Sequence, residues 1–276
     1  MRQTENYGAS EGRKLVRYLT DNGQYIFSIE QAHAAAEKLG IPKSYESVLL
    51  TSLFQGKWVQ RLRRGLYSIA DVSIHPFAIA TRLVEPSAIS HWSALNHHGL
   101  TEQIPQAVFA ITPTKVVTPS MRSSSSARPA ERHAWEVGAA RYHYMTVKHE
   151  YFFGIDPVWV SEQFRIPMTN KERTVLETFA SPRLFGGIGE ALSVVEQHAD
   201  KLDIKQLVDY ARRYGKASVA KRLGWALGRA GISEKTLVPL RNIPLTGIAI
   251  LDPTRPRRGP INSRWQILEN LAGRVV

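Results

Sequence analysis

Cationic and hydroxyl side chains gather between residues 43 and 64, and their types suit contacts with nucleic acid. Arginine and lysine bind phosphate oxygens, while hydroxyl groups reach phosphates or base edges. The residues that we expect to contact DNA are Lys43, Ser44, Tyr45, Ser47, Thr51, Arg61, Arg63 and Arg64. An isolated arginine cluster is more often a solvated edge. The elements around this set therefore decide between the two interpretations.

Two helices joined by a tight turn should position the first part of this set. Residues 29–39 are rich in alanine and follow Ser28, whose hydroxyl can cap a helix start. Gly40-Ile41-Pro42 breaks the pattern, because glycine accepts positive φ and proline can begin a new helix. A second helix over 43–55 would then turn Lys43, Ser44, Ser47 and Thr51 towards a major groove. The residues that it should bury are Val48, Leu49 and Leu53.

A basic hairpin is predicted directly after the second helix. Residues 58–62 and 65–69 alternate apolar and polar side chains around the turn Arg63-Arg64-Gly65. A cationic hairpin in this position can touch the phosphates beside the groove that the helix reads. The sequence therefore predicts a winged helix-turn-helix that binds DNA.

The remainder of the chain predicts a larger mixed domain. With a helix over 12–21 before the motif, the winged domain should span 1–72 and the second domain 73–276. In the second domain we expect helices at 76–83, 91–98, 173–180, 190–198, 204–213, 216–230 and 262–271. Strands are expected at 106–112, 134–137, 142–147, 157–160 and 246–251. The predicted fold class is α+β.

Composition narrows the class of protein. The 276 residues include no cysteine, which excludes disulfides and thiolate metal sites and favours an intracellular protein. Without a signal peptide or a long apolar run, we expect a soluble cytoplasmic protein and no membrane. The net charge of +12 suits a polyanionic partner, and most of the excess lies in residues 151–276.

Candidate catalytic groups do not assemble into a known motif. His91, His97 and His98 lack the carboxylate of a zinc-hydrolase helix. The glycines of 186–189 lack the lysine of a phosphate-binding loop, and no nucleophile elbow surrounds Ser90 or Ser93. We therefore expect no enzyme activity, no metal and no cofactor.

The order of these parts resembles the AbiEi antitoxin family of type IV toxin-antitoxin systems. The resemblance extends through most of the chain and is carried by residues 23–67, 89–105 and 169–192, including Lys171-Glu172-Arg173-Thr174 and Gly186-Gly187. The Arg-Gly-Leu-Tyr wing at 64–67 is common among winged proteins, whereas the segments after it are more particular to this family.

The resemblance implies two activities. Family members bind inverted repeats in their own promoter through the N-terminal domain and repress the operon. Their C-terminal domain counters a nucleotidyltransferase-like toxin encoded next door, typically without a stable complex. On this chain Lys43, Ser44, Tyr45 and Ser47 would face bases, and Arg61, Arg63 and Arg64 would hold phosphates.

Two other functions stay open at this point. The first is a stand-alone winged-helix regulator whose C-terminal domain senses a ligand. The second is a nuclease that uses Asp156 and Glu162, although no lysine follows Glu162 at the spacing that a nuclease carboxylate set needs.

Overall fold

The computed structural model describes residues 2–118 and 134–271, without the side chains of residues 2–9, 46 and 47. The chain divides into two compact units. Unit 1 comprises Met1–Glu85 with the short segments 137–140 and 159–166, and unit 2 comprises the remainder. Unit 1 thus continues past residue 72, where the sequence suggested a boundary. Both units mix helices and strands, so the predicted α+β class is confirmed.

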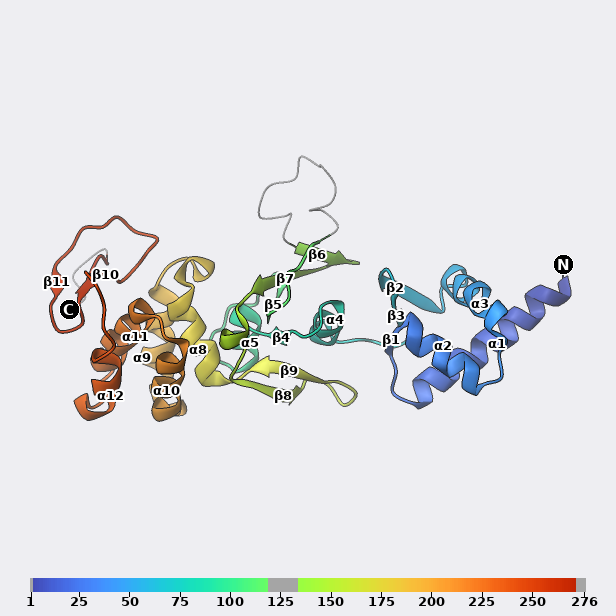
Figure 1. Cartoon of the computed structure of the whole chain (residues 1–276), viewed down its shortest axis with the longest axis horizontal. Coiled ribbons are helices and arrows are strands. Elements are labelled where there is room, and N and C mark those ends of the chain that lie inside the picture. Colours follow the sequence, from blue (N-terminus) through green and yellow to red (C-terminus); the bar gives the residue numbers. More distant parts are fainter. Residues whose placement is uncertain (1, 119–133, 272–276) are drawn as a thin grey trace. The chain divides into compact units, whose positions relative to one another are not determined.

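Unit 1 contains four helices and a small antiparallel sheet (Figure 1). Its elements are α1 (Arg2–Asp21), β1 (Ile26–Ser28), α2 (Ile29–Lys38), α3 (Lys43–Gln55), β2 (Val59–Arg63), β3 (Leu66–Ile69) and α4 (Pro76–Leu83). The strand order is β1-β3-β2. The predicted bounds of α3 and α4 are confirmed, whereas α1 begins ten residues earlier than residue 12.

Local signals explain where α2 begins and ends. The side chain of Ser28 accepts a hydrogen bond from the Gln31 amide at 3.2 Å, and the Gln31 side chain accepts one from the Ser28 amide at 2.8 Å. This reciprocal capping box satisfies two amides that the first helical turn leaves without partners. At the other end Gly40 adopts a φ of +70°, a conformation that favours glycine. The predicted cap at Ser28 and turn at Gly40 are confirmed.

The core of unit 1 forms where α1, α2 and α3 pack on the sheet. Leu15 and Leu19 of α1, Ala32 of α2 and Leu49 of α3 are fully buried around Phe27. The Phe27 ring also stacks on Tyr67 of β3, with 6.0 Å between ring centroids. Buried apolar area is the main stabilising contribution to a helical layer of this kind.

Unit 2 is built on a six-stranded mixed sheet with the order β6-β7-β5-β4-β9-β8. These strands are β4 (Ala88–Ile89), β5 (Val108–Thr112), β6 (Ala134–Val137), β7 (Ala140–Thr146), β8 (Ile155–Trp159) and β9 (Arg165–Thr169). β5 pairs parallel with β7 and antiparallel with β4, while β4 pairs parallel with β9. The sequence predicted β5 to β8 approximately but not β4 or β9.

A helical layer gathers at one end of this sheet (Figure 1). It contains α8 (Lys171–Ala180), α9 (Gly189–His198), α10 (Ile204–Tyr214), α11 (Ala217–Arg229) and α12 (Glu234–Arg241), and α5 (His91–His97) packs against α8. Val175, Leu176 and Phe179 of α8 are fully buried, as predicted. The sequence did not predict α12, which carries Pro239 inside it.

The end of the described chain differs from the prediction. A closing helix over 262–271 was expected, but this region forms β11 (Ile261–Asn262) and β12 (Ile267–Leu268), which pair antiparallel, while β12 pairs parallel with β10 (Ala249–Ile250). Asn262 turns the chain by accepting a hydrogen bond from the Trp265 amide at 3.1 Å. The indole of Trp265 is buried, so tertiary packing overrides the helical pattern.

Within the described residues, the helices are too short or too polar to cross a membrane.

Candidate nucleic-acid interface

Helix α3 is held in unit 1 by one apolar face. Leu49, Leu50 and Leu53 are buried against the core. Val48 was expected on this face, but its side chain is 53% exposed. The prediction for Val48 was wrong because the buried face of α3 is centred on Leu49, Leu50 and Leu53, and Val48 lies on the other side of Leu49 from Leu50. Val48 therefore lies on the exposed side of α3.

The predicted base-contacting residues of α3 lie in different environments. Lys43, Ser44 and Thr51 are exposed. Tyr45 is half-buried, and its ring packs against the core of unit 1. Ser47 belongs to α3, but its side chain lies outside what the structure describes.

The three arginines that we expected to bind phosphate lie on the hairpin of β2 and β3 and differ in their exposure. Arg61 and Arg64 are exposed, whereas Arg63 is half-buried. The Nε atom of Arg63 donates to the backbone oxygen of Leu83 at 3.1 Å, and its Nη1 atom donates to the backbone oxygen of Arg64 at 3.2 Å. Arg63 thus ties the hairpin to the end of α4, and of the three arginines only Arg61 and Arg64 are exposed.

The candidate catalytic residues of the sequence analysis lie in two kinds of environment. The serines make internal contacts, and the two carboxylates are exposed. The hydroxyl of Ser90 lies 2.8 Å from Nδ1 of His91, and the hydroxyl of Ser93 accepts a hydrogen bond from the Phe109 amide. Asp156 and Glu162 are exposed. Over the ranges described, no group of three or more histidines and carboxylates could hold a metal ion.

The glycine-rich segment before α9 binds a carboxylate of the chain itself, that of Asp252. Oδ2 of Asp252 accepts a hydrogen bond from the Ile188 amide at 3.4 Å, and a Cβ atom on Gly187 would lie 2.8 Å from the same oxygen. Burial raises the pKa of Asp252, but hydrogen bonds from Thr254 and Ile188 and the charge of Arg255 together outweigh it, so the pKa is lowered. The negative charge that a helix N-terminus attracts is therefore supplied internally.

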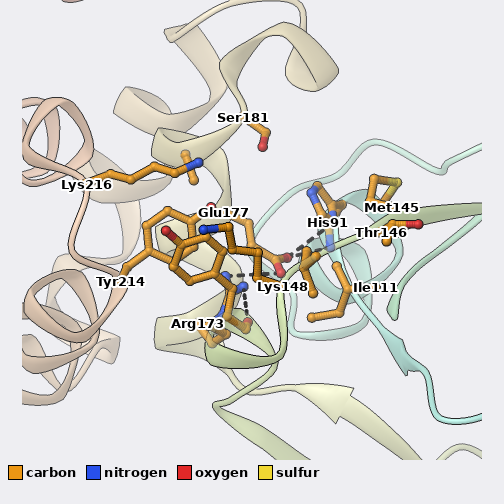
Figure 2. A pocket seen from close by; sticks show the side chains of 13 residues that line it. His91, Ile111, Met145, Thr146, Lys148, Arg173, Glu177, Ser181, Tyr214 and Lys216 are labelled. Carbon is orange, nitrogen blue, oxygen red and sulfur yellow. Dashed lines mark hydrogen bonds and ion pairs between the residues drawn. The ribbon is translucent and has the colours of Figure 1, made fainter. Parts of the chain in front are cut away.

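A cavity of about 460 Å³ lies within unit 2, and the sequence did not single it out. Its polar lining comes from the start of α5, from β7 and the residues after it, from α8 and the residue after it, from the end of α10 and from the N-cap of α11 (Figure 2). The polar or charged lining residues are His91, Thr146, Lys148, Tyr151, Arg173, Glu177, Ser181, Tyr214 and Lys216.

A buried ionic network forms the floor of this cavity. Arg173 and Glu177 are 2% exposed and lie one turn apart on α8, with Nη1 of Arg173 3.2 Å from Oε1 of Glu177. Nη2 of Arg173 donates to the backbone oxygen of Tyr151 at 3.1 Å. Oε2 of Glu177 accepts a hydrogen bond from the His91 amide at 2.9 Å. The charges are thus paired and largely removed from water.

His91 joins this network with its backbone in the left-handed region. Its φ is +51°, a conformation that histidine, asparagine and aspartate adopt more often than most other residues with a side chain. Burial lowers the pKa of the His91 imidazole and outweighs the opposing effect of Glu177, while Arg173 lowers the pKa further. The imidazole is therefore neutral at pH 7.

Aromatic rings and lysines line the cavity beside Arg173, whose Cζ atom lies 5.5 Å from the centroid of the Tyr214 ring. The rings of Tyr151 and Tyr214 stack with 4.5 Å between centroids. Nζ of Lys216 lies 5.4 Å from both centroids, and Nζ of Lys148 lies 6.0 Å from that of Tyr151. In the sequence, Arg173 and Glu177 stand four residues apart on a predicted helix, a spacing that allows an ion pair, but nothing connects them with the other lining residues.

Comparisons with known proteins give a likeness of fold. No protein-family model matches the chain, and no curated protein matches it. The chain is similar to a Mycobacterium tuberculosis protein of known crystal structure, with a TM-score of 0.58 and 12% sequence identity. The likeness covers 94% of this chain and 90% of that one. At this identity the likeness concerns the fold alone.

Proposed function

We propose that the chain is a transcriptional repressor that binds double-stranded DNA through a winged helix-turn-helix in unit 1. The proposal rests on one observation: the basic β2-β3 hairpin directly follows helix α3 and contacts it. Lys43, Ser44 and Thr51 present polar groups on α3, and Arg61 and Arg64 present charges on the hairpin. In such a motif the second helix reads the major groove and the hairpin holds phosphates.

The proposed repressor is also an antitoxin. This part rests on the resemblance of the sequence to AbiEi antitoxins, and it assigns neutralisation of a nucleotidyltransferase-like toxin to the C-terminal part of the chain. The inverted repeats of the chain's own promoter are the proposed DNA target. The excess positive charge of residues 151–276 agrees with a nucleic-acid or acidic partner for that part too.

DNA binding is tested by titrating the full chain with its promoter at several salt concentrations. The double variant R61A/R64A should bind more weakly and reduce the salt slope by about two, because each lost phosphate contact contributes about one. The matched control K201A/K205A removes two charges from exposed lysines of unit 2 and should keep the wild-type slope. Unchanged affinity and slope in R61A/R64A would exclude the hairpin as a phosphate clamp.

Neutralisation is tested in cells that express the adjacent toxin gene from an independent promoter. The wild-type chain and R61A/R64A should both restore growth, because the proposal assigns neutralisation to the C-terminal part. Failure of the wild-type chain to restore growth would reject the antitoxin proposal for this toxin and leave DNA binding to be judged by the titration.

A second candidate function is a stand-alone regulator whose C-terminal domain senses a ligand. The cavity of about 460 Å³ in unit 2 favours it, because sites for small molecules typically enclose about 300–1,000 Å³. Under this alternative, DNA affinity should change when a small molecule is added, and no toxin gene should lie beside the chain's own gene.

A further inference from the structure

The cavity of unit 2 has the charge expected of an anion site. Lys148, Arg173 and Lys216 contribute positive charges, and Glu177 is the only acidic side chain among the described residues that line it. Arg173 already pairs with Glu177. Nζ of Lys148 lies 3.5 Å from Oε1 of Glu150, but both side chains are exposed and water screens this pair, so Lys148 and Lys216 can both attract a negative ligand. Lys148 and Lys216 are exposed, and their side chains reach the cavity from the segment after β7 and from the N-cap of α11 (Figure 2).

The floor of the cavity holds polar atoms whose hydrogen bonding is incomplete. Nε and Nη1 of Arg173 and Oε1 of Glu177 are buried and have no hydrogen-bond partner within the described structure. The Nη1 and Oε1 atoms are 3.2 Å apart, but their orientation does not form a hydrogen bond. Buried groups of this kind are costly unless a ligand or water satisfies them. A ligand that supplies both an acceptor and a donor would complete the floor.

The tyrosine pair adds an apolar, aromatic wall. Tyr151 and Tyr214 stack on each other, and burial raises the pKa of Tyr214, so its phenol stays neutral. Rings of this kind pack against the flat faces of nucleobases, and nearby cations strengthen the contact. One ligand class combines an anion, hydrogen-bond donors and a flat aromatic group.

We propose that this cavity binds a nucleoside phosphate. The phosphate contacts Lys148 and Lys216, a hydroxyl or amino group of the nucleoside donates to Glu177, and the base packs against the tyrosine pair. This inference concerns unit 2 alone and does not depend on DNA binding by unit 1.

The proposal is tested by calorimetric titration of the full chain with AMP, GMP, CMP, UMP and inorganic phosphate, without DNA. At least one nucleotide should bind more tightly than phosphate. The variant K148M/K216M should weaken that binding by about tenfold or more, because hydrogen bonds between charged groups are the strong ones. The control K201M/K205M removes the same charge from exposed lysines of unit 2 outside the cavity and should bind as the wild type does.

A second variant separates the base from the phosphate. Tyr151→Leu should weaken nucleotide binding while phosphate binding stays unchanged, because leucine removes the aromatic face only. The proposal is overturned if no nucleotide binds at millimolar concentration, if phosphate binds as tightly as every nucleotide, or if K201M/K205M loses as much affinity as K148M/K216M. Circular dichroism of each variant shows whether a loss of binding reflects loss of the fold.

Discussion

The carboxylate of Glu177 accepts a hydrogen bond from the backbone amide of His91, 2.9 Å away and 86 residues earlier in the chain. This contact joins the start of α5 to the middle of α8. The second carboxylate oxygen of Glu177 faces Arg173 at 3.2 Å. One acidic side chain therefore satisfies the first turn of α5 and balances a buried guanidinium.

Replacement of Glu177 should destabilise the protein strongly. Glu177→Ala leaves Arg173 buried without its counter-charge, and we expect a loss of about 3–5 kcal/mol in the free energy of unfolding. Glu177→Gln keeps an acceptor for the His91 amide and should lose less. Urea unfolding measures both, with Glu196→Ala on the exposed side of α9 as a control that should change by less than about 0.5 kcal/mol. A loss below about 1 kcal/mol for Glu177→Ala would show that the network contributes little.

Stability should fall as the pH drops below about 6.5, the ordinary pKa of histidine. Folding lowers the pKa of His91, so the unfolded chain binds a proton more readily than the folded protein does. Acid therefore favours the unfolded state and lowers the free energy of unfolding. Burial also lowers the pKa values of His97 and His98, which act in the same direction.

His91→Asn tests the contribution of one histidine to this pH dependence. Asparagine tolerates the positive φ of the site and does not titrate. The variant should therefore show a shallower fall in unfolding free energy between pH 7 and pH 5, and the same slope as the wild type at alkaline pH. Identical slopes over the acid range would contradict the role of His91.

Features set by neighbouring residues were predictable from the sequence. The bounds of α3 and α4 and the cap at Ser28 all follow from residues within a few positions of the helix start. Such signals act through backbone hydrogen bonds that distant residues hardly change. The same reasoning placed Arg61 and Arg64 on a hairpin.

Features set by distant partners were not predictable. The buried face of α3 includes Leu50 and leaves Val48 exposed, and Arg63 is held by a backbone oxygen twenty residues away. The cavity of unit 2 combines residues from β7, α8 and α10 that no local pattern connects. The prediction of a closing helix over 262–271 was wrong for the same reason, because Trp265 packs on the distant helix α11.

Removal of the Ser28 hydroxyl should destabilise unit 1. Ser28→Ala loses the bond from the Gln31 amide, and substitution of a serine N-cap costs about 1 kcal/mol. Thermal unfolding followed by circular dichroism measures the change. Ser52→Ala replaces an exposed serine within α3 and should be close to neutral. If the two variants unfold alike, the capping box does not stabilise α2.

Arg63 and Arg64 should differ in what their removal changes. Arg63→Ala loses the hydrogen bond to Leu83, so we expect a loss of about 1 kcal/mol in stability and little change in the salt slope of DNA binding. Arg64→Ala should leave stability unchanged and, on the proposed function, reduce the salt slope by about one. Urea unfolding and DNA titration of both variants separate the two roles. If Arg63→Ala changed the salt slope and Arg64→Ala changed the stability, the roles given to these two arginines would be wrong.

Two glycines of α11 should respond in opposite ways to the same substitution. A Cβ atom on Gly224 would overlap the buried indole of Trp265, whereas one on Gly228 would lie 3.6 Å from Cδ1 of Leu237, an ordinary contact. Overpacking costs about 1–3 kcal/mol, so Gly224→Ala should destabilise unit 2. Gly228→Ala should be neutral or stabilise by up to about 1 kcal/mol, because alanine favours a helix over glycine. Urea unfolding of the two variants measures the difference. Equal stability would mean that the indole of Trp265 does not pack on α11 as described.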